Sequence, residues 1–404
     1  MVIWYISKYA SSVKYSASTR HFYLGEEWAK TGNDVTIFSS NSSHLSNSFP
    51  ELNKSYLIEN INGVKVVWFK IIKSKFSSSI SRILGWFLFD LKLLLLSKKK
   101  LTKPDVIIVS SLSLTTVLPG WILSKWYRSK FVFEVRDIWP MSAIILSGKS
   151  KYHPFFLYLS WLEKLGYRNA NLIVGTMPNL SEHVNVNCKI YTKTITIPQG
   201  VNLFSIEQES QILEQEFIDK YIPKDKFIVC YAGTMNLNNP LDDFIRAARI
   251  LKDRTDIFFV LIGSGSNRMT LQQKSKDLNN VVFPPSIAKS KMISLLNLVD
   301  VCYDACHSEL ATYGLSRNKW IDYMYSAKPI ICSYDGYQSM INEAHSGTFV
   351  KFGREKELAD MILEYASYSN EKITMMGCLA KEFILQNRPF DKLAAQYLTE
   401  IKAC

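Results

Sequence analysis

The sequence has no apolar run long enough to cross a membrane. Its longest, residues 83–96, is interrupted by Asp90 and Lys92, whereas a transmembrane helix needs about 20 residues. The N-terminal apolar stretch, residues 2–6, is short and has no basic segment before it, so no signal peptide is expected. Together these absences predict a cytoplasmic chain.

Signatures of metal and disulfide sites are also missing. The seven cysteines are an odd number and include no C-x-x-C pair. We therefore expect reduced thiols, with Cys302 and Cys306 as small buried residues. Asp304 and His307 lie close in sequence but lack a third ligand. No D-x-D motif occurs, and we expect neither a metal nor a cofactor.

The composition is that of a folded, basic chain. With 404 residues, of which 47% are hydrophobic, the chain fits two domains of about 150–200 residues each. A net charge of +12 suits nucleic acid, an anionic membrane or phosphorylated substrates. Composition alone does not choose among these.

Strand and helix patterns alternate in both halves of the chain. A strand at 2–6, a helix at 19–30 and a strand at 35–38 open a doubly wound α/β domain, whose ligands sit at the strand carboxyl ends. Further strands are expected at 64–69, 106–109, 131–134, 172–174, 227–232, 257–262, 281–283 and 299–303. Because residues 205–215 are polar and lack apolar periodicity, we place the first domain at 1–205 and the second at 206–387.

A turn, a helix and a buried strand are predicted around Gly314. Ser316 is a good helix N-cap, and Arg317 and Lys319 lie beside the helix start. A helix N-terminus carries a partial positive charge, so this site suits a phosphate or diphosphate. Asp322, further along, could accept hydrogen bonds from sugar hydroxyls. The alternative is an ordinary capped helix of an α/β domain.

Residues 313–332 resemble the nucleotide-sugar signature of family-4 (group 1) glycosyltransferases, E-x-F-G-x-x-x-x-E followed by A-M-A-x-G-x-P-V-I. They are more similar still to a bacterial subgroup of O-antigen and capsular polysaccharide synthesis, which has G-L-S-P-N-K-x-x-D-Y-M here. Asp322 takes the place of the second acidic residue. The first is absent, because Gly314 stands eight residues before Asp322.

Three other motifs follow the family's order. They are Ser18-Thr19-Arg20, residues 134–140 (E-V-R-D-I-W-P) and residues 197–202 (I-P-Q-G-V-N). Many members carry a histidine where Arg136 stands before Asp137, so the role of that imidazole does not transfer. The planar fork of an arginine could hold phosphate or sugar oxygens instead. The alternative is a structural Arg136–Asp137 pair.

The resemblance also implies donor-binding turns in the second half. The family has G-x-G-x-x-R where this chain has residues 263–268, and G-R-x-x-x-x-K-G at Gly233. Thr234 and Asn239 occupy the places of that arginine and lysine, so Arg317 and Lys319 are the expected substitutes. The expected catalytic residues are Arg136, Asp137, Arg317 and Lys319. The expected donor-binding residues are Gly233, Thr234, Gly263, Gly265, Arg268, Ile287, Gly314, Leu315, Ser316, Asn318 and Asp322.

The fold that the resemblance implies is α/β of GT-B type: two Rossmann-like domains facing a cleft, with the C-terminal helix, about 388–404, crossing back to the first domain. The second domain would bind a nucleotide sugar, with UDP as the expected nucleotide and an N-acetylated amino sugar as one option. The first domain would bind the acceptor, with Ser18 and Arg20 as contacts; for Arg20 the alternative is a solvated charge. Transfer would retain anomeric configuration without a metal, as part of surface polysaccharide synthesis.

A helix predicted over 76–100 has apolar residues at helical spacing and ends in lysines 98–100. It could be a core helix. It could also enter the inner leaflet through Trp86, Phe87 and Phe89 while the lysines face anionic lipid. With the resemblance, this predicts a peripheral membrane protein that acts on a saccharide linked to polyprenyl diphosphate.

Two other functions stay open. A nucleotide-sugar epimerase of the same fold would need paired carboxylates or a histidine for acid–base chemistry, yet His153, His183, His307 and His345 are scattered. A nucleic-acid-binding protein would need basic residues clustered with aromatics, but the lysines are spread over many loops. We therefore expect no nucleic-acid partner.

Overall fold

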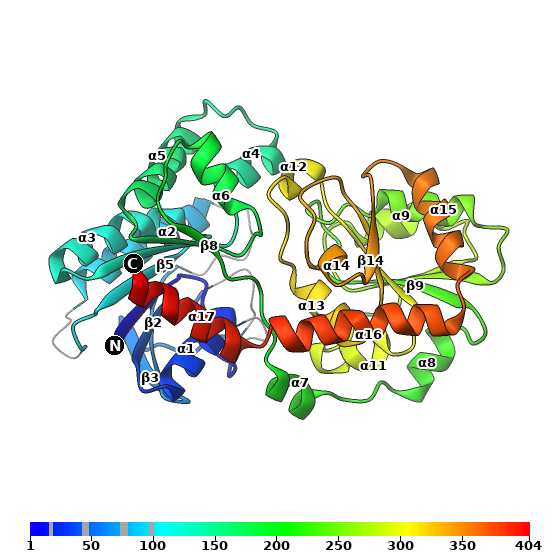
Figure 1. Ribbon diagram of the computed structural model, residues 1–404, viewed down its shortest axis with the longest axis horizontal. Coiled ribbons are helices and arrows are strands. Elements are labelled where there is room, and N and C mark those ends of the chain that lie inside the picture. Colours follow the sequence, from blue (N-terminus) through cyan, green and yellow to red (C-terminus); the bar gives the residue numbers. More distant parts are fainter. Residues whose placement is uncertain (16–18, 43–47, 73–79, 97–100) are drawn as a thin grey trace. The chain divides into compact units, whose positions relative to one another are not determined.

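The computed structural model describes residues 1–15, 19–42, 48–72, 80–96 and 101–404 (Figure 1). These form two compact units, Met1–Gly200 with Phe390–Cys404 and Val201–Pro389. The chain thus divides at Gly200, whereas the sequence analysis placed the boundary at 205. Residues 203–209, expected in part to be linker, form a helix. Ser18 and the lysines at 98–100 lie outside the described residues.

The first unit contains an eight-stranded sheet in the order β3-β4-β2-β1-β5-β6-β7-β8. Its strands are β1 (Val2–Ile6), β2 (Asp34–Ser40), β3 (Tyr56–Ile61), β4 (Val64–Phe69), β5 (Val106–Ser110), β6 (Lys130–Val135), β7 (Leu172–Gly175) and β8 (Thr194–Thr196). All neighbours pair parallel except β3, which is antiparallel to β4. Because β3 is a half-exposed edge strand with only partly buried side chains, its hydrophobic signal is weak, and the sequence analysis missed it.

Helices cover the sheet of the first unit, as a parallel sheet requires. They are α1 (Arg20–Lys30), α2 (Ile80–Leu95), η2 (Leu114–Thr116), α3 (Val117–Tyr127), α4 (Met141–Ser147), α5 (Pro154–Asn169), α6 (Leu180–Glu182), η3 (His183–Asn187) and α17 (Phe390–Ala403). The last of these packs against α1 (Figure 1). Trp28 Nε1 donates to the Ala394 carbonyl at 2.9 Å, and Phe390 and Leu393 lie against Gly200. The predicted return of the C-terminal helix is therefore confirmed.

The second unit has a six-stranded parallel sheet in the order β11-β10-β9-β12-β13-β14. Its strands are β9 (Phe227–Ala232), β10 (Ile257–Ile262), β11 (Val281–Val282), β12 (Val301–Ala305), β13 (Ile330–Ser333) and β14 (Gly347–Val350). Its helices are α7 (Leu203–Glu209), α8 (Gln215–Tyr221), α9 (Asp242–Ile250), α10 (Arg268–Lys274), η4 (Lys289–Lys291), α11 (Met292–Leu296), α12 (Ser308–Ala311), α13 (Asn318–Tyr325), α14 (Met340–Glu343), α15 (Glu355–Ala366) and α16 (Asn370–Asn387).

Each sheet has one point where the strand order reverses. In the first unit it lies between β1 and β5, and in the second between β9 and β12. Loops after two such strands leave in opposite directions, which opens a crevice at the carboxyl ends where ligands of α/β proteins bind. The functional search therefore starts at these two points.

The helix α2 shows which face of the apolar 83–96 segment is buried. Trp86 and Phe89 are core residues, 1% and 0% exposed, while Phe87 is 45% exposed. The expectation that Trp86 and Phe89 enter a lipid leaflet is therefore wrong, because Trp86 packs against Trp139 and Phe155. Phe89 packs against Phe69 on β4. Within the described residues, we find no helix long and apolar enough to span a bilayer.

Candidate functional site

A buried carboxylate with two cations lies at the reversal point of the second sheet. Asp304, near the end of β12, is 0% exposed. Nη1 of Arg317 lies 2.9 Å from each of its two oxygens, and Nζ of Lys319 lies 2.9 Å from Oδ1. Trp320 Nε1 donates to Oδ2 at 2.8 Å. Arg317, Lys319 and Trp320 thus each donate to the one carboxylate of Asp304.

Residues after β9 complete this cluster. Oδ1 of Asn239 accepts from Arg317 Nη1 at 2.9 Å and from Lys319 Nζ at 3.1 Å. The Tyr231 hydroxyl accepts from Lys319 at 3.0 Å and donates to the Thr234 carbonyl at 2.7 Å. The structure therefore brings together Arg317, Lys319 and Asn239, three positions that the sequence analysis linked only through the resemblance.

The cluster carries a net positive charge of one, from two cations and one anion. Burial alone would raise the pKa of Asp304, but Arg317 and Lys319 hold that pKa below its usual value. Burial lowers the pKa of Lys319, against the attraction of Asp304. Both cations keep about one sixth of their side-chain surface exposed, 16% and 15%. An anion can therefore reach the two cations from solvent, while Asp304 fixes their positions from the buried side.

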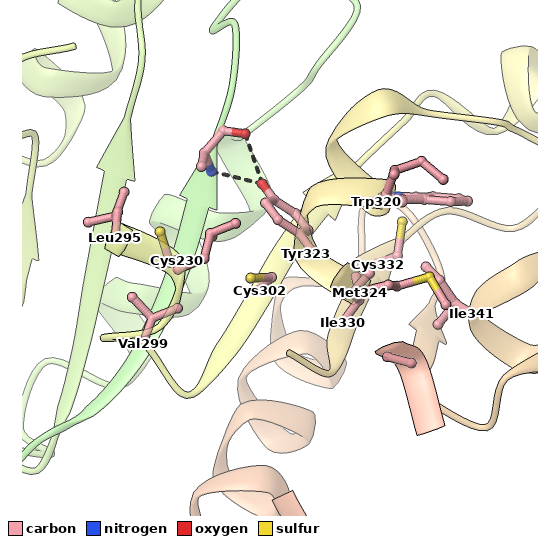
Figure 2. Packing of buried hydrophobic residues seen from close by; sticks show 14 of the residues in the cluster. Cys230, Leu295, Val299, Cys302, Trp320, Tyr323, Met324, Ile330, Cys332 and Ile341 are labelled. Atoms are coloured by element: carbon pink, nitrogen blue, oxygen red, sulfur yellow. Dashed lines mark hydrogen bonds between the residues drawn. The ribbon is translucent and has the colours of Figure 1, made fainter. Parts of the chain in front are cut away.

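Tyr323 holds α13 against the end of β9. Its hydroxyl accepts from the Ala232 amide at 2.8 Å and donates to the Ala232 carbonyl at 2.9 Å (Figure 2). Cys230 and Cys302 lie beside it in the same buried cluster, and both are reduced, as expected. This contact sets the start of α13 next to Gly233, where a Cβ would stand 3.3 Å from the Lys319 ammonium.

The two glycines after β10 serve close backbone packing. Gly263 and Gly265 have φ of +134° and +147°, a region that favours glycine. A Cβ at Gly265 would lie 2.1 Å from the Met235 carbonyl oxygen, and the Met235 amide donates to the Ser264 carbonyl at 2.8 Å. The turns after β9 and β10 thus continue the pairing of their strands beyond the sheet.

Arg268, an expected donor contact, is committed to the backbone. Its guanidinium donates to the carbonyls of Gly263 at 2.6 Å, Phe283 at 2.9 Å and Pro284 at 2.8 Å. It therefore ties the glycine turn to the loop after β11. The expected donor contact of Arg268 stays a prediction that would need these bonds to rearrange.

Asp322 lies apart from the Asp304 cluster. It forms an ion pair with Lys289 at the start of η4, and burial raises the pKa of Asp322 while Lys289 opposes that rise. Ile287, two residues before Lys289, packs against the adjoining core. The structure therefore brings Asp322 and the Ile287 loop to one place, as a site for a ribose and a base would need.

The helix start differs from the sequence-based expectation. Arg317, with extended backbone, is the N-cap of α13, and its side chain makes no capping hydrogen bond. The expectation that Ser316 is the N-cap is wrong, because Arg317 still has extended dihedrals. The other expected donor residues lie around this start: Thr234 and Asn318 are exposed, Leu315 and Ser316 are partly buried, and Gly314 makes the preceding turn with a φ of +83°.

A second polar cluster lies at the reversal point of the first sheet. Arg20 and Glu134 form an ion pair whose side chains are both 0% exposed. Nη2 of Arg20 also donates to the Ile197 carbonyl at 2.8 Å, and the Tyr5 hydroxyl donates to Glu134. The alternative that Arg20 is a solvated charge is therefore wrong. Its expected acceptor contact stays a prediction.

His21, which the sequence analysis did not consider, lies in this same cluster. Its Nε2 is 2.9 Å from the Ser110 hydroxyl at the end of β5. Burial lowers the pKa of His21, and the charges of Arg136 and Arg20 lower it further. A neutral imidazole therefore lies beside the Arg136 position, even though that position has no histidine.

Arg136 and Asp137 do not form a side-chain ion pair among the described residues. Asp137 accepts from Trp139 Nε1 at 3.1 Å and from the Ser142 hydroxyl, which orients the loop before α4. Burial raises the pKa of Asp137. Burial lowers the pKa of Arg136, and nearby Glu134 opposes that. The side chain of Arg136 makes no hydrogen bond within the described part of the chain, so its donors can serve a ligand.

Sequence reasoning missed Tyr5, His21, Glu134, Tyr231 and Asp304 as members of these clusters. Position could have indicated three of them, since Tyr5, Tyr231 and Asp304 lie near the ends of strands at the reversal points. Glu134 lies on β6, next to β5, and His21 lies in the first turn of α1. Asp304 was considered only as a metal ligand with His307. The structure excludes that pairing, because Asp304 binds Arg317 and Lys319, while Nε2 of His307 lies 3.0 Å from the Leu237 carbonyl.

Comparisons with known proteins agree with this architecture. Residues 226–367, which lie within the second unit, match the sequence profile of the family described as Glycosyl transferases group 1. No curated protein sequence matches the chain.

Three solved structures are similar over the whole chain. Sucrose-phosphate synthase from Thermosynechococcus elongatus has a TM-score of 0.70 and 15% identity, covering 100% of this chain and 98% of its own. The E. coli trehalose-6-phosphate protein bound with UDP-2-fluoro glucose has a TM-score of 0.75 and 10% identity. The match covers 100% of this chain and 99% of that protein. HepE of Anabaena in complex with UDP-glucose has a TM-score of 0.67 and 15% identity, and the match covers 100% of both chains. The chain therefore has the GT-B fold that was predicted.

Proposed function

We propose that the chain transfers a sugar from a nucleotide-sugar donor, held by the second unit, to an acceptor held by the first. The observation that carries this proposal is the Asp304 cluster, since residues 226–367 match a transferase family and enclose two partly exposed cations at the sheet's reversal point. We name UDP as the nucleotide, because two of the similar structures hold a UDP-sugar. The sugar could be an N-acetylated amino sugar.

The chemistry follows from charge. In the reaction the bond between the anomeric carbon and the diphosphate oxygen breaks, and a bond to an acceptor hydroxyl forms. The nucleoside diphosphate leaves with an added negative charge, and the hydroxyl proton is released. Arg317 and Lys319 are placed to stabilise the growing charge of the leaving diphosphate, because Asp304 holds both charges in position before the substrate arrives. The three donors of Lys319 bond to Tyr231, Asn239 and Asp304, so a direct contact with the diphosphate would exchange one of these bonds. Because these cations could balance the charge of the diphosphate, we propose transfer without a metal, and with retention of configuration as the resemblance implies.

Measuring nucleoside diphosphate release from a panel of nucleotide sugars tests the proposal. We expect release from one donor class that rises when a saccharide linked to polyprenyl diphosphate is added, in the presence of EDTA. Conversion of the donor without any acceptor would instead favour the epimerase, for which the buried imidazole of His21 offers an acid–base group. Failure of every nucleotide sugar and free nucleotide to bind would overturn the proposal.

We further propose that the first unit binds the anionic face of a membrane, on the side of α2 and α5. Apolar side chains recur there at helical spacing and are 45–74% exposed: Leu84, Phe87, Leu91 and Leu95 on α2, and Leu157 and Trp161 on α5. We call these six residues the apolar stripe. Tyr158 joins its two halves, with ring centroids 6.4 Å from Phe87 and 6.1 Å from Trp161.

The charges of these helices suit an anionic surface. The only carboxylates in α2 and α5 are Asp90 and Glu163, and both are buried. Lys164 and Arg168 on α5 and Lys125 on the neighbouring α3 are exposed. Apolar surface beside exposed cations is the pattern of proteins that lie on a lipid surface. If the first unit lies on the membrane in this way, its acceptor would be a lipid-linked saccharide in the inner leaflet of the plasma membrane, as in O-antigen or capsule synthesis.

Sedimentation with vesicles containing anionic lipid tests the membrane proposal. We expect Phe87→Ser with Leu91→Ser to lose most vesicle binding at all salt concentrations, because apolar burial is not screened. Met269→Ser on α10 is the matched control, since Met269 is 81% exposed in the second unit. Wild-type protein that stays in the supernatant and glycosylates a water-soluble acceptor equally well would overturn it.

A further inference from the structure

Three chemically distinct side chains converge on one point in the first unit, away from both reversal points. They are Glu163 on α5, His183 at the start of η3 and Cys188 just after η3. One carboxylate oxygen, one imidazole nitrogen and one sulfur all lie within 4.8 Å of one another. Within the described residues, no other group of three such side chains meets that condition.

The ligand atoms of this cluster are close enough to one another to bind one ion. Nε2 of His183 lies 2.9 Å from Oε1 of Glu163 and 3.7 Å from Sγ of Cys188. Zinc bonds of roughly 2.0–2.3 Å at tetrahedral angles separate neighbouring ligand atoms by about 3.3–3.6 Å. The Nε2–Sγ distance is close to this range, and the Nε2–Oε1 distance, which is a hydrogen-bond length, would increase by about half an ångström when an ion replaces the shared proton.

The geometry argues against a nucleophilic triad. In a triad the thiol and the carboxylate bind opposite nitrogens of the imidazole. Here both face the same nitrogen, Nε2. A single N–H can point directly at only one of two acceptors, whereas a cation can bind the nitrogen, the oxygen and the sulfur together.

The surroundings of the cluster hold it in place. The Tyr167 hydroxyl donates to Oε1 of Glu163 at 3.2 Å, which orients the carboxylate as outer partners of metal ligands do. The Cys188 amide donates to the His183 carbonyl at 3.0 Å, so the one-turn π-helix of η3 brings the two side chains together. Glu163 and His183 are buried, and Cys188 is partly exposed. An ion can therefore enter from the Cys188 side, with water in a fourth position.

We propose that Glu163, His183 and Cys188 form a binding site for a divalent transition-metal ion, with Zn²⁺ as the ion that a mixed sulfur, nitrogen and oxygen set favours. The site links α5 to the segment before β8, and so stabilises the first unit. It is separate from the donor cluster and does not depend on the proposed transfer. Without the ion, the same atoms share a proton, since Glu163 and Cys188 raise the pKa of His183 to about 9 against the effect of burial.

Titration of the reduced, chelator-treated full chain with Co²⁺ tests the site. We expect one Co²⁺ per chain with a thiolate-to-metal charge-transfer band, displaced by Zn²⁺. Cys188→Ser should abolish the band, and Glu163→Gln should weaken binding at least tenfold. Cys378→Ser is the matched control, because Cys378 is an exposed thiol outside the cluster, and it should leave the band unchanged.

The pH dependence adds a second readout. The groups that face His183 are Glu163, Tyr167 and Cys188, and the imidazolium proton must leave before a metal binds. The apparent affinity should therefore rise at least about tenfold per pH unit from 7 towards 9. A wild-type chain without the band, or a band that survives Cys188→Ser, would overturn the proposal.

Discussion

Arg317 and Asp304 form a bifurcated contact, in which Nη1 of the guanidinium lies 2.9 Å from both carboxylate oxygens. The carboxylate is fully buried, and the guanidinium is partly exposed. The positively charged member of the pair is therefore the one in contact with solvent, where an anionic ligand could bind. Asp304 acts as a positioning residue in this arrangement, and Arg317 and Lys319 are the groups that would touch the diphosphate.

Lys319→Ala should lower kcat of sugar transfer by about 100- to 1,000-fold, since a preorganised donor to the developing charge is lost. Arg317→Ala should also lower kcat, with an added loss of stability because it removes a partner of buried Asp304. Lys252→Ala, an exposed residue after α9, is the control for the loss of one charge. Steady-state kinetics with saturating donor gives the comparison. Near-normal turnover in both variants would mean that the diphosphate is held elsewhere.

Asp322→Ala should weaken donor binding more than it lowers turnover, if Asp322 binds sugar or ribose hydroxyls in the ground state. Since Asp322 pairs with Lys289, a double-mutant cycle with Lys289→Ala separates the ion pair from the ligand contact. Calorimetric titration with the nucleotide sugar provides the affinities. Equal donor affinity in wild type and Asp322→Ala would refute a direct contact.

Arg20→Met should destabilise the protein by roughly 3–5 kcal/mol, because it leaves the fully buried Glu134 without its cation. Lys30→Met is the control, since Lys30 pairs with Glu27 at the surface, where an ion pair contributes about 1 kcal/mol or less. Urea denaturation gives both values. An Arg20→Met protein with normal stability but impaired transfer would instead support the predicted acceptor contact.

Gly265→Ala should destabilise the second unit and weaken donor binding. The added Cβ would meet the Met235 carbonyl oxygen at 2.1 Å, at a φ of +147°. Gly148→Ala is the comparison, because Gly148 also has a positive φ, +63°, in a region that other residues can adopt, and has nothing within 4 Å of its Cβ position. Thermal unfolding should therefore show a clearly larger decrease in Tm for Gly265→Ala, and similar decreases would contradict the close-packing interpretation.

In metal-free protein, stability should depend on pH through His183. Its pKa is raised in the folded state to about 9, from about 6.5 in an unfolded chain. The stabilisation is therefore complete below pH 6.5 and is lost as pH rises to about 9, by roughly 3 kcal/mol at most. His183→Gln should remove this part of the pH profile. Denaturation curves from pH 6 to 9.5 that run parallel for both proteins would exclude it.

The sequence by itself determined the fold class and the main elements. Continuous apolar runs such as 106–109 and 257–262 can only be buried on both faces, so they predicted parallel strands. The Tyr313-to-Cys332 pattern predicted a turn, a helix and a strand, and the structure contains them. These features are local, because the identity of neighbouring residues decides them.

Only the tertiary structure decided which side chains meet. Asp304 stands 13 positions before Arg317 and 65 after Asn239, and no sequence pattern joins the three, yet the reversal of strand order between β9 and β12 places them within hydrogen-bond distance. In the same way, packing against Trp139 and Phe155 buries Trp86 while Phe87 is left exposed. The face that a helix buries depends on the surface it packs against, and that surface comes from distant parts of the chain.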